Sequence, residues 1–297
     1  MFEGLSVALV TPFREGKIDE PSTERLVDFV VQGGTDVLVV AGTTGEAPCL
    51  TRDERRRLYQ IVKAANGGRA RLVAGTGTNN TRDSIELTEE ARAAGYDGAL
   101  VVVPYYNKPT AAGQIAHFTA IAKSTDLPLI LYNVPGRTGT NMSPDTVARL
   151  SQVENIVAIK EASGSLDHVS AIRARCDLTV LSGDDSLTLP MLAIGARGVI
   201  SVAGNAAPRP LKNMLVAFGE GRLVDAETIH RSLVPLMRAL FIESNPGPVK
   251  SLLADMGLIA NELRLPLVPV ERETARAVRD AARAAGVTLK ESVAVGA

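Results

Sequence analysis

The sequence has little of the chemistry that binds metals or cross-links small folds. It contains no tryptophan, three histidines and two cysteines among 297 residues. Cys49 and Cys176 are too few to staple a chain of this length, and neither they nor the histidines occur at the short spacings of a zinc site. We therefore expect no bound metal and interpret both cysteines as structural thiols of a reducing compartment.

The chain also lacks an excess of charge of either sign and lacks long apolar runs. The formal net charge is −1, and acidic and basic residues are scattered along the chain, which leaves no basic surface for a nucleic acid. No stretch approaches the roughly 20 apolar residues that span a bilayer. The first residues lack the basic and long apolar regions of a signal peptide. We expect a cytoplasmic protein that binds neither nucleic acid nor membrane.

Nucleotide-binding motifs are absent or incomplete. Gly75-Thr76-Gly77 follows a predicted strand, but Asn80 occupies the place of the third glycine in a dinucleotide fingerprint. The sequence contains no Gly-Lys-Ser or Gly-Lys-Thr phosphate loop. We therefore expect no cofactor.

The chain does contain a repeated alternation of short apolar runs and amphipathic segments. Most runs are apolar throughout, as in parallel strands covered on both faces, and segments 52–65 and 81–94 show helical spacing. The eight predicted strands are 6–10, 36–40, 71–74, 98–103, 127–132, 156–160, 178–181 and 198–202. Eight strands with their crossovers favour an α/β fold that closes as a (β/α)8 TIM barrel, and an open doubly wound sheet is the alternative.

The strand pattern stops near residue 223, and the rest of the chain is predicted to be helical. Helices are expected at 224–239, 248–256 and 272–285, and Pro248 suits the first position of the second one. We predict a barrel over residues 1–222 that carries the active site. Residues 223–297 would form a C-terminal helical region packed on the barrel, with a separate domain as the alternative.

Polar residues cluster where the predicted strands end. In a barrel, these carboxyl ends form one rim that carries the chemistry. The segments that follow the strands are Gly42-Thr43-Thr44-Gly45-Glu46, Pro104-Tyr105-Tyr106-Asn107, Tyr132 to Gly139, Lys160-Glu161 and Ser182-Gly183-Asp184-Asp185. Residues far apart in the sequence are thus predicted to meet at one mouth.

Lys160 is the most informative of these residues. It follows the apolar run 156–159, so its amine is predicted to lie in a desolvated interior, where burial disfavours the ammonium form and lowers the pKa. A neutral amine is what nucleophilic attack on a ketone requires. The alternative is a lysine that pairs with a buried carboxylate or extends to the rim.

An amine that attacks a ketone forms an imine, and the steps that make and use the imine each move a proton. The site therefore also needs a proton-transfer group, here one that is neither a metal nor a histidine. Tyr132 is the candidate, and hydrogen bonds to Thr43 and Tyr106 would organise a relay around its hydroxyl. The turn at 42–45 suits a small carboxylate, and Arg137 can bind a carboxylate through two parallel bonds. Taken singly, these residues also have simpler interpretations as a packing tyrosine, a glycine-rich turn and a solvated arginine.

In this order and spacing, the motifs resemble those of the dihydrodipicolinate synthases, or 4-hydroxy-tetrahydrodipicolinate synthases, of the N-acetylneuraminate lyase family of class I aldolases. The resemblance covers nearly the whole chain. The motifs that carry it are Ala8-Leu9-Val10-Thr11-Pro12, Thr43-Thr44, Tyr105-Tyr106-Asn107, Tyr132 to Arg137, Ile159-Lys160-Glu161, Ser182-Gly183-Asp184-Asp185, Gly198-Val199-Ile200-Ser201 and Asn245 to Lys250. Some are loose individually, but together they are highly specific.

The resemblance implies a lyase that condenses pyruvate with L-aspartate 4-semialdehyde to give 4-hydroxy-tetrahydrodipicolinate, in lysine and diaminopimelate biosynthesis. Lys160 matches the lysine that forms an imine (Schiff base) with pyruvate. Tyr132 matches the residue that shuttles protons, with Thr43 and Tyr106 completing its relay. Tyr106 would reach in from a neighbouring subunit.

The resemblance also implies how the substrates are held. Thr44 and the backbone at Ile200 match positions that bind pyruvate, and Gly183 matches a residue that lines the site. Arg137 matches the arginine that receives the semialdehyde carboxylate. The family assembles as dimers, often paired into tetramers, so we expect a homo-oligomer such as a homotetramer.

Relatives with other activities provide the alternatives. Sialic acid lyases typically have Ser-Thr where this chain has Thr43-Thr44, and they lack the Gly-Arg-Thr-Gly stretch around Arg137. Aldolases and dehydratases that act on sugar keto acids remain as alternatives. A catalytically silent small-molecule sensor is disfavoured, because Lys160, Tyr132, Thr43 and Tyr106 are all intact.

Regulation is where the sequence departs from some relatives. Lysine-inhibited members bind lysine in a dimer cleft with positions that match Arg52, Arg55, Asn79, Asp83 and Tyr105. Some of these members have histidines where this chain has the two arginines. Because two permanent cations would repel an incoming ammonium, we predict weak or absent feedback by lysine.

Overall fold

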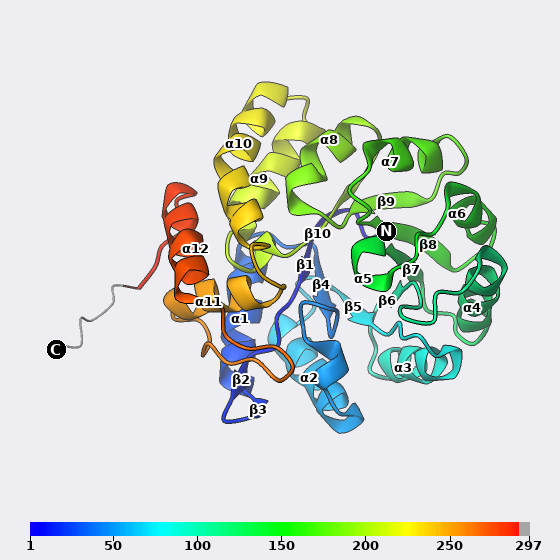
Figure 1. Cartoon of the computed structure of the whole chain (residues 1–297), viewed down its shortest axis with the longest axis horizontal. Coiled ribbons are helices and arrows are strands. Elements are labelled where there is room, and N and C mark those ends of the chain that lie inside the picture. Colours follow the sequence, from blue (N-terminus) through cyan, green and yellow to red (C-terminus); the bar gives the residue numbers. More distant parts are fainter. Residues whose placement is uncertain (291–297) are drawn as a thin grey trace.

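The computed structural model describes residues 1–290 and has a closed barrel of eight parallel strands at its centre (Figure 1). The strands are β1 (Gly4–Ala8), β4 (Val37–Val40), β5 (Arg71–Gly75), β6 (Gly98–Val102), β7 (Leu129–Asn133), β8 (Ile156–Glu161), β9 (Thr179–Ser182) and β10 (Gly198–Ser201). β1 pairs with both β4 and β10, so the sheet has no free edge. The predicted TIM barrel is therefore confirmed, and the open sheet is wrong.

Helices occupy the connections and surround the barrel (Figure 1). They are α1 (Glu20–Gln32), α2 (Arg52–Asn66), α3 (Thr81–Ala93), α4 (Ala111–Lys123), α5 (Pro135–Thr138), α6 (Pro144–Leu150), α7 (Leu166–Arg173), α8 (Thr188–Ala193) and α9 (Pro208–Gly219), with short 3₁₀ turns η1 (Ala47–Cys49), η2 (Asp185–Leu187) and η3 (Ala203–Asn205). α2 shows how local sequence sets such bounds. It begins with a capping box between Thr51 and Glu54 and ends at Gly67 in the left-handed region.

Alternation along the strands divides the core into two layers. Side chains that face into the barrel include Val39, Leu100, Ile130, Tyr132, Ala158, Leu181 and Ile200. Their neighbours, such as Leu131 and Ile159, face outward and pack under the helices. Because strand side chains alternate with period two, Lys160 faces inward like Ala158. It is also the register partner of Tyr132 on the adjacent strand.

The C-terminal part contains α10 (Leu223–Ala239), α11 (Gly247–Asp255) and α12 (Arg272–Ala284). α10 packs on α9 and α12, which places this region against one side of the barrel (Figure 1). α11 begins one residue earlier than predicted, so Pro248 is its second residue rather than its first. The domain boundary at residue 222 stays a prediction, and residues 291–297 of the predicted region lie outside the described residues.

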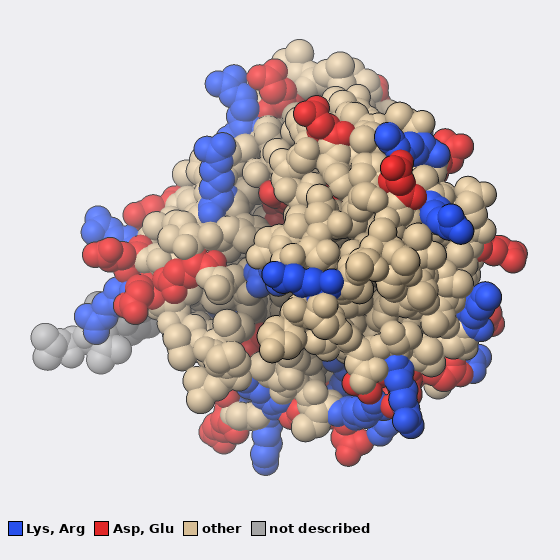
Figure 2. All heavy atoms as spheres, turned by 45° about the vertical axis from the view of Figure 1, so that its right-hand side comes forward, with Lys and Arg blue, Asp and Glu red and all other residues tan. Residues whose placement is uncertain are grey.

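The surface carries charge of both signs. Basic and acidic side chains are intermixed on the face shown in Figure 2. Within residues 1–290, no helix is both long enough and apolar enough to cross a membrane. The small antiparallel hairpin of β2 (Phe13–Arg14) and β3 (Lys17–Ile18) was not predicted.

A fully buried ion pair ties the C-terminal region to the loop after β4. Lys250 Nζ lies 2.6 Å from Glu46 Oε1, and both side chains are 0% exposed. The backbone N–H of Arg264 donates to Glu46 Oε2 at 2.9 Å. Burial lowers the pKa of Lys250, while the Glu46 carboxylate acts in the opposite direction. Glu46 adopts a left-handed φ of 53°, which is costly for a residue other than glycine, so these contacts hold the loop in place.

Replacing Lys250 with alanine should destabilise the fold by about 3–5 kcal/mol, because the Glu46 carboxylate would stay buried without a counter-charge. Urea unfolding followed by circular dichroism gives the free energy of unfolding. Arg231→Ala, which removes an exposed ion pair with Glu227, is the control and should leave that free energy nearly unchanged. A loss below about 1 kcal/mol for Lys250→Ala would contradict the expectation.

Candidate active site

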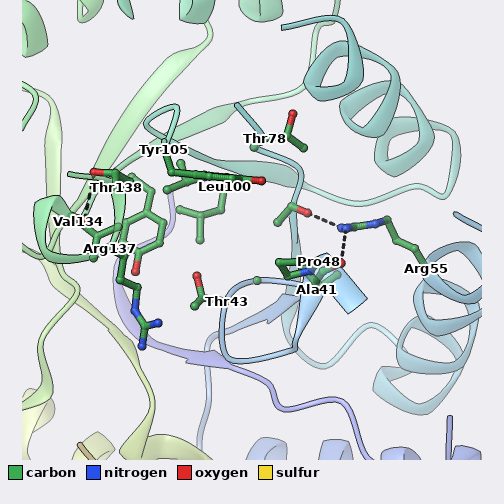
Figure 3. A pocket seen from close by; sticks show the side chains of 16 residues that line it. Ala41, Thr43, Pro48, Arg55, Thr78, Leu100, Tyr105, Val134, Arg137 and Thr138 are labelled. Carbon is green, nitrogen blue, oxygen red and sulfur yellow. Dashed lines mark hydrogen bonds between the residues drawn. The ribbon is translucent and has the colours of Figure 1, made fainter. Parts of the chain in front are cut away.

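A cavity of about 280 Å³ lies at the carboxyl ends of the strands (Figure 3). Its walls come from the loop after β4, from β5 and β6 with their loops, and from β7 and α5. Thr43, Tyr132 and Arg137, three of the eight predicted site residues, line it. Arg137 and Arg55 lie on opposite sides of this space in Figure 3. The rim thus collects side chains from distant parts of the sequence, as predicted.

Lys160 is buried beside Tyr132 in the barrel interior. The two side chains are 5% and 7% exposed, and Lys160 Nζ lies 4.3 Å from the centroid of the Tyr132 ring. Within residues 1–290, Lys160 forms no ion pair. The adjacent Glu161 faces the other way and accepts hydrogen bonds from Asn133 Nδ2 and the Ser163 N–H. The predicted burial of Lys160 is therefore confirmed, and the alternative of a lysine paired with a buried carboxylate is not supported.

Gly183 provides the space that the Lys160 side chain occupies. A Cβ atom placed on Gly183 would lie 3.0 Å from Lys160 Cε and 2.7 Å from Ala162 Cβ. Contacts this short force a neighbour to shift, so the absence of a side chain at the end of β9 permits the close approach. Gly183 is thus placed against Lys160.

Thr44 and Ile200 lie near the rim but do not line the cavity. Thr44 is 3% exposed, and its Oγ1 accepts a hydrogen bond from Asn245 Nδ2 at 3.0 Å. Ile200 is buried in the barrel interior and pairs in register with Ser6 of β1. Both side chains are therefore held by contacts inside the protein.

Tyr106 is not brought to the site by the fold of a single chain. Its side chain is 87% exposed and its φ is 69°, while the neighbouring Tyr105 lines the cavity. Within residues 1–290, the Tyr132 hydroxyl forms no hydrogen bond with Thr43 or Tyr106. The relay predicted from the sequence is therefore not assembled within one chain.

Arg137 lies on α5, directly after the strand that carries Tyr132. Its Nη2 donates to the backbone carbonyl of Asn245 at 3.5 Å, and the side chain borders the cavity. Within the described residues it pairs with no carboxylate. A guanidinium in this setting can bind an anionic ligand at the mouth.

Several polar residues that support the rim had no predicted role. The Asp185 carboxylate is buried and accepts hydrogen bonds from the Ser201 hydroxyl and from the N–H groups of Val202 and Ala203, at 3.0 and 2.9 Å for the backbone donors. Burial raises the pKa of Asp185, and these hydrogen bonds oppose the increase. Asp185 thereby joins the loops after β9 and β10. Asn245 entered the sequence analysis only as the first residue of the motif from Asn245 to Lys250.

The described residues 1–290 hold no group of three or more His, Cys, Asp or Glu side chains that could coordinate a metal ion.

Comparisons with known proteins found similar sequences and similar solved structures. The model of the Dihydrodipicolinate synthetase family matches residues 1–285. The chain is 52% identical over 272 residues to a 4-hydroxy-tetrahydrodipicolinate synthase of Pelobacter propionicus, which covers 91% of this chain and 94% of the relative. The crystal structure of dihydrodipicolinate synthase from Aquifex aeolicus superposes with a TM-score of 0.95 at 46% identity, over 97% of this chain and 100% of that one.

A further solved structure belongs to a protein described as the first monomeric dihydrodipicolinate synthase variant. It has a TM-score of 0.95 and 42% identity, and it covers 97% of this chain and 98% of that one. The match of the family model over nearly the whole chain, together with these identities, shows that the chain belongs to the dihydrodipicolinate synthetase family.

Proposed function

We propose that this protein condenses pyruvate with L-aspartate 4-semialdehyde to give 4-hydroxy-tetrahydrodipicolinate, a step of lysine and diaminopimelate biosynthesis. The observation that carries the proposal is the Lys160 amine, which is buried in the barrel, free of ion pairs within residues 1–290 and in contact with Tyr132. The names of the related synthases support this choice of substrates.

Lys160 is the nucleophile of the proposed reaction. Its amine adds to the keto carbon of pyruvate, and loss of water gives the imine. The imine nitrogen withdraws electrons, so the methyl carbon loses a proton and an enamine forms. The enamine carbon then attacks the aldehyde carbon, and the aldehyde oxygen takes up a proton. The amino group of the adduct displaces Lys160 as the ring closes, which returns the free amine.

Tyr132 is the proposed proton-transfer group of these steps. Its ring contacts the Lys160 amine, so its hydroxyl is held close to the carbons that lose and gain protons. Thr43 and Tyr106 would complete the relay. Because Tyr106 is exposed within its own chain, we assign it to the site of a neighbouring subunit.

Three further residues would bind the substrates, and a fourth, Gly183, would make room for the lysine. Thr44 and the backbone at Ile200 hold pyruvate, and Gly183 leaves room for the lysine that carries it. Arg137 receives the semialdehyde carboxylate through its two parallel N–H groups. In this arrangement the carboxylate of pyruvate and that of the semialdehyde lie at different parts of one mouth.

The proposed assembly is a homo-oligomer, a dimer or tetramer, that works in the cytoplasm. The exposure of Tyr106 supports the assembly, because a relay that needs this residue is complete only when two chains meet. One relative is described as monomeric, so family membership alone does not decide the point.

Borohydride reduction in the presence of pyruvate should attach a reduced pyruvyl group to Lys160, because borohydride traps the imine. Peptide mass spectrometry locates the adduct, and Lys160→Ala is the control that should show none. L-aspartate 4-semialdehyde supplied before reduction should deplete the adduct. An adduct that ignores the semialdehyde would favour an aldolase for sugar keto acids. Absence of any adduct would refute the imine chemistry.

Gly183→Ala should lower kcat/KM on the order of 100-fold, because the new methyl group displaces Lys160 from its position against Tyr132. Steady-state kinetics measures the effect. Gly219→Ala is the matched control, since a Cβ on Gly219 meets no atom within 4 Å and should leave kcat/KM unchanged. Equal activity of both variants would show that the close approach is not required.

L-lysine should inhibit weakly or not at all in a steady-state assay, and sub-millimolar inhibition would overturn this prediction. Arg52 lies 2.7 Å from Glu86 and 3.3 Å from Glu90, so its charge is largely compensated. Arg55 instead donates to the carbonyls of Gly75 and Ala47. We therefore expect Arg55→His to gain more sensitivity to lysine than the control variant Arg52→His.

A further inference from the structure

Asn245 connects the C-terminal region to both parts of the mouth that are proposed to bind carboxylates. It lies in the turn between α10 and α11 and is 5% exposed. Its side-chain Nδ2 donates to Thr44 Oγ1 at 3.0 Å, although the two residues are 201 positions apart. Its backbone carbonyl accepts a hydrogen bond from Arg137 Nη2 at 3.5 Å. One residue thus contacts Thr44 with its side chain and Arg137 with its backbone.

The direction of the bond to Thr44 has a chemical consequence. A hydroxyl group donates one hydrogen bond and accepts two. Because the amide of Asn245 donates, the Thr44 oxygen is the acceptor and its own proton stays available. Within residues 1–290, the Thr44 hydroxyl donates to no other group, although the residue is 3% exposed. A buried donor of this kind favours an anionic acceptor from the substrate.

Asn245 itself is held firmly. The turn leads into α11, where Lys250 forms the buried ion pair with Glu46 at 2.6 Å. Glu46 follows Thr44 by two residues in the same loop. The turn and the loop are therefore joined at two points, so the distance between Asn245 and Thr44 is fixed from both sides. Asn245 Oδ1 is buried and has no hydrogen-bond partner among the described residues. The orientation of the side-chain amide therefore depends on the bond from Nδ2 to Thr44.

We propose that Asn245 is a positioning residue that holds the Thr44 hydroxyl as a hydrogen-bond donor towards the carboxylate of pyruvate. It acts through Thr44 and makes the C-terminal region part of the pyruvate site. The inference rests on the proposed function, because it takes pyruvate as the ligand of Thr44.

A double-mutant cycle with Asn245→Ala and Thr44→Val tests the proposal. The readout is the pyruvate concentration that gives half-maximal trapping of the imine by borohydride, which needs no aldehyde. Asn245→Ala should raise this concentration on the order of 10-fold, and Thr44→Val by a similar factor. The double variant should bind pyruvate no worse than Thr44→Val alone. The KM for the semialdehyde should stay unchanged in Asn245→Ala, because the backbone carbonyl that contacts Arg137 remains.

Two further variants guard against an effect on folding alone. Asn245→Asp keeps the shape of the side chain but replaces the donor with an acceptor, so it should turn the Thr44 proton away from pyruvate and weaken trapping at least as much as alanine does. Asn66→Ala is the matched control: Asn66 is 1% exposed and donates to the Ala70 carbonyl at 2.7 Å. It should lower stability without changing the half-maximal pyruvate concentration.

Penalties that add in the double variant, or an Asn245→Asp variant that binds pyruvate like the unmutated protein, would overturn the inference. These outcomes differ from a failure of the proposed function. If the unmutated protein traps no imine at all, the proposed function fails. If the unmutated protein traps the imine and Asn245→Ala traps the same amount at each pyruvate concentration, this inference alone fails.

Discussion

The rest of the site depends on one constraint, which is that the amine of Lys160 stays buried without a counter-charge. Charged groups are seldom buried unless they are paired, so such a position must be created by the fold. The closed barrel creates it here. The register between β7 and β8 sets Tyr132 beside Lys160, and Gly183 leaves the space through which the lysine side chain extends. A change in any of these features would move the amine or change its surroundings.

The chain contains a second buried lysine, and the contrast explains how one residue type serves two purposes. Lys250 is fully buried against Glu46, and this pair fixes the loop that presents Thr43 and Thr44. Lys160 has no such partner within residues 1–290, and its amine lies over the ring of Tyr132. The paired lysine supports structure, whereas the lysine without a carboxylate is suited to nucleophilic chemistry. The C-terminal region therefore stabilises the mouth from outside the barrel.

The sequence was sufficient to predict the features that follow from local periodicity. Apolar runs located the eight strands to within a few residues, and the run before Lys160 indicated a buried amine. Contacts between distant residues could not be predicted in this way. Nothing in the local pattern indicates that Lys250 meets Glu46 or that Asn245 meets Thr44, because those pairs depend on how the C-terminal turn docks on the rim. Nor does periodicity reveal that Tyr106 is exposed and does not line the cavity of its own chain.

If Lys160 and Tyr132 act as proposed, they together make the pyruvate methyl group exchange protons through an imine and an enamine. The most direct measurement is proton NMR of pyruvate incubated with the protein in deuterated water, without an aldehyde. The methyl signal should disappear with the unmutated protein, disappear much more slowly with Tyr132→Phe, and persist with Lys160→Ala. Exchange that continues at an undiminished rate in Lys160→Ala would contradict the proposed mechanism.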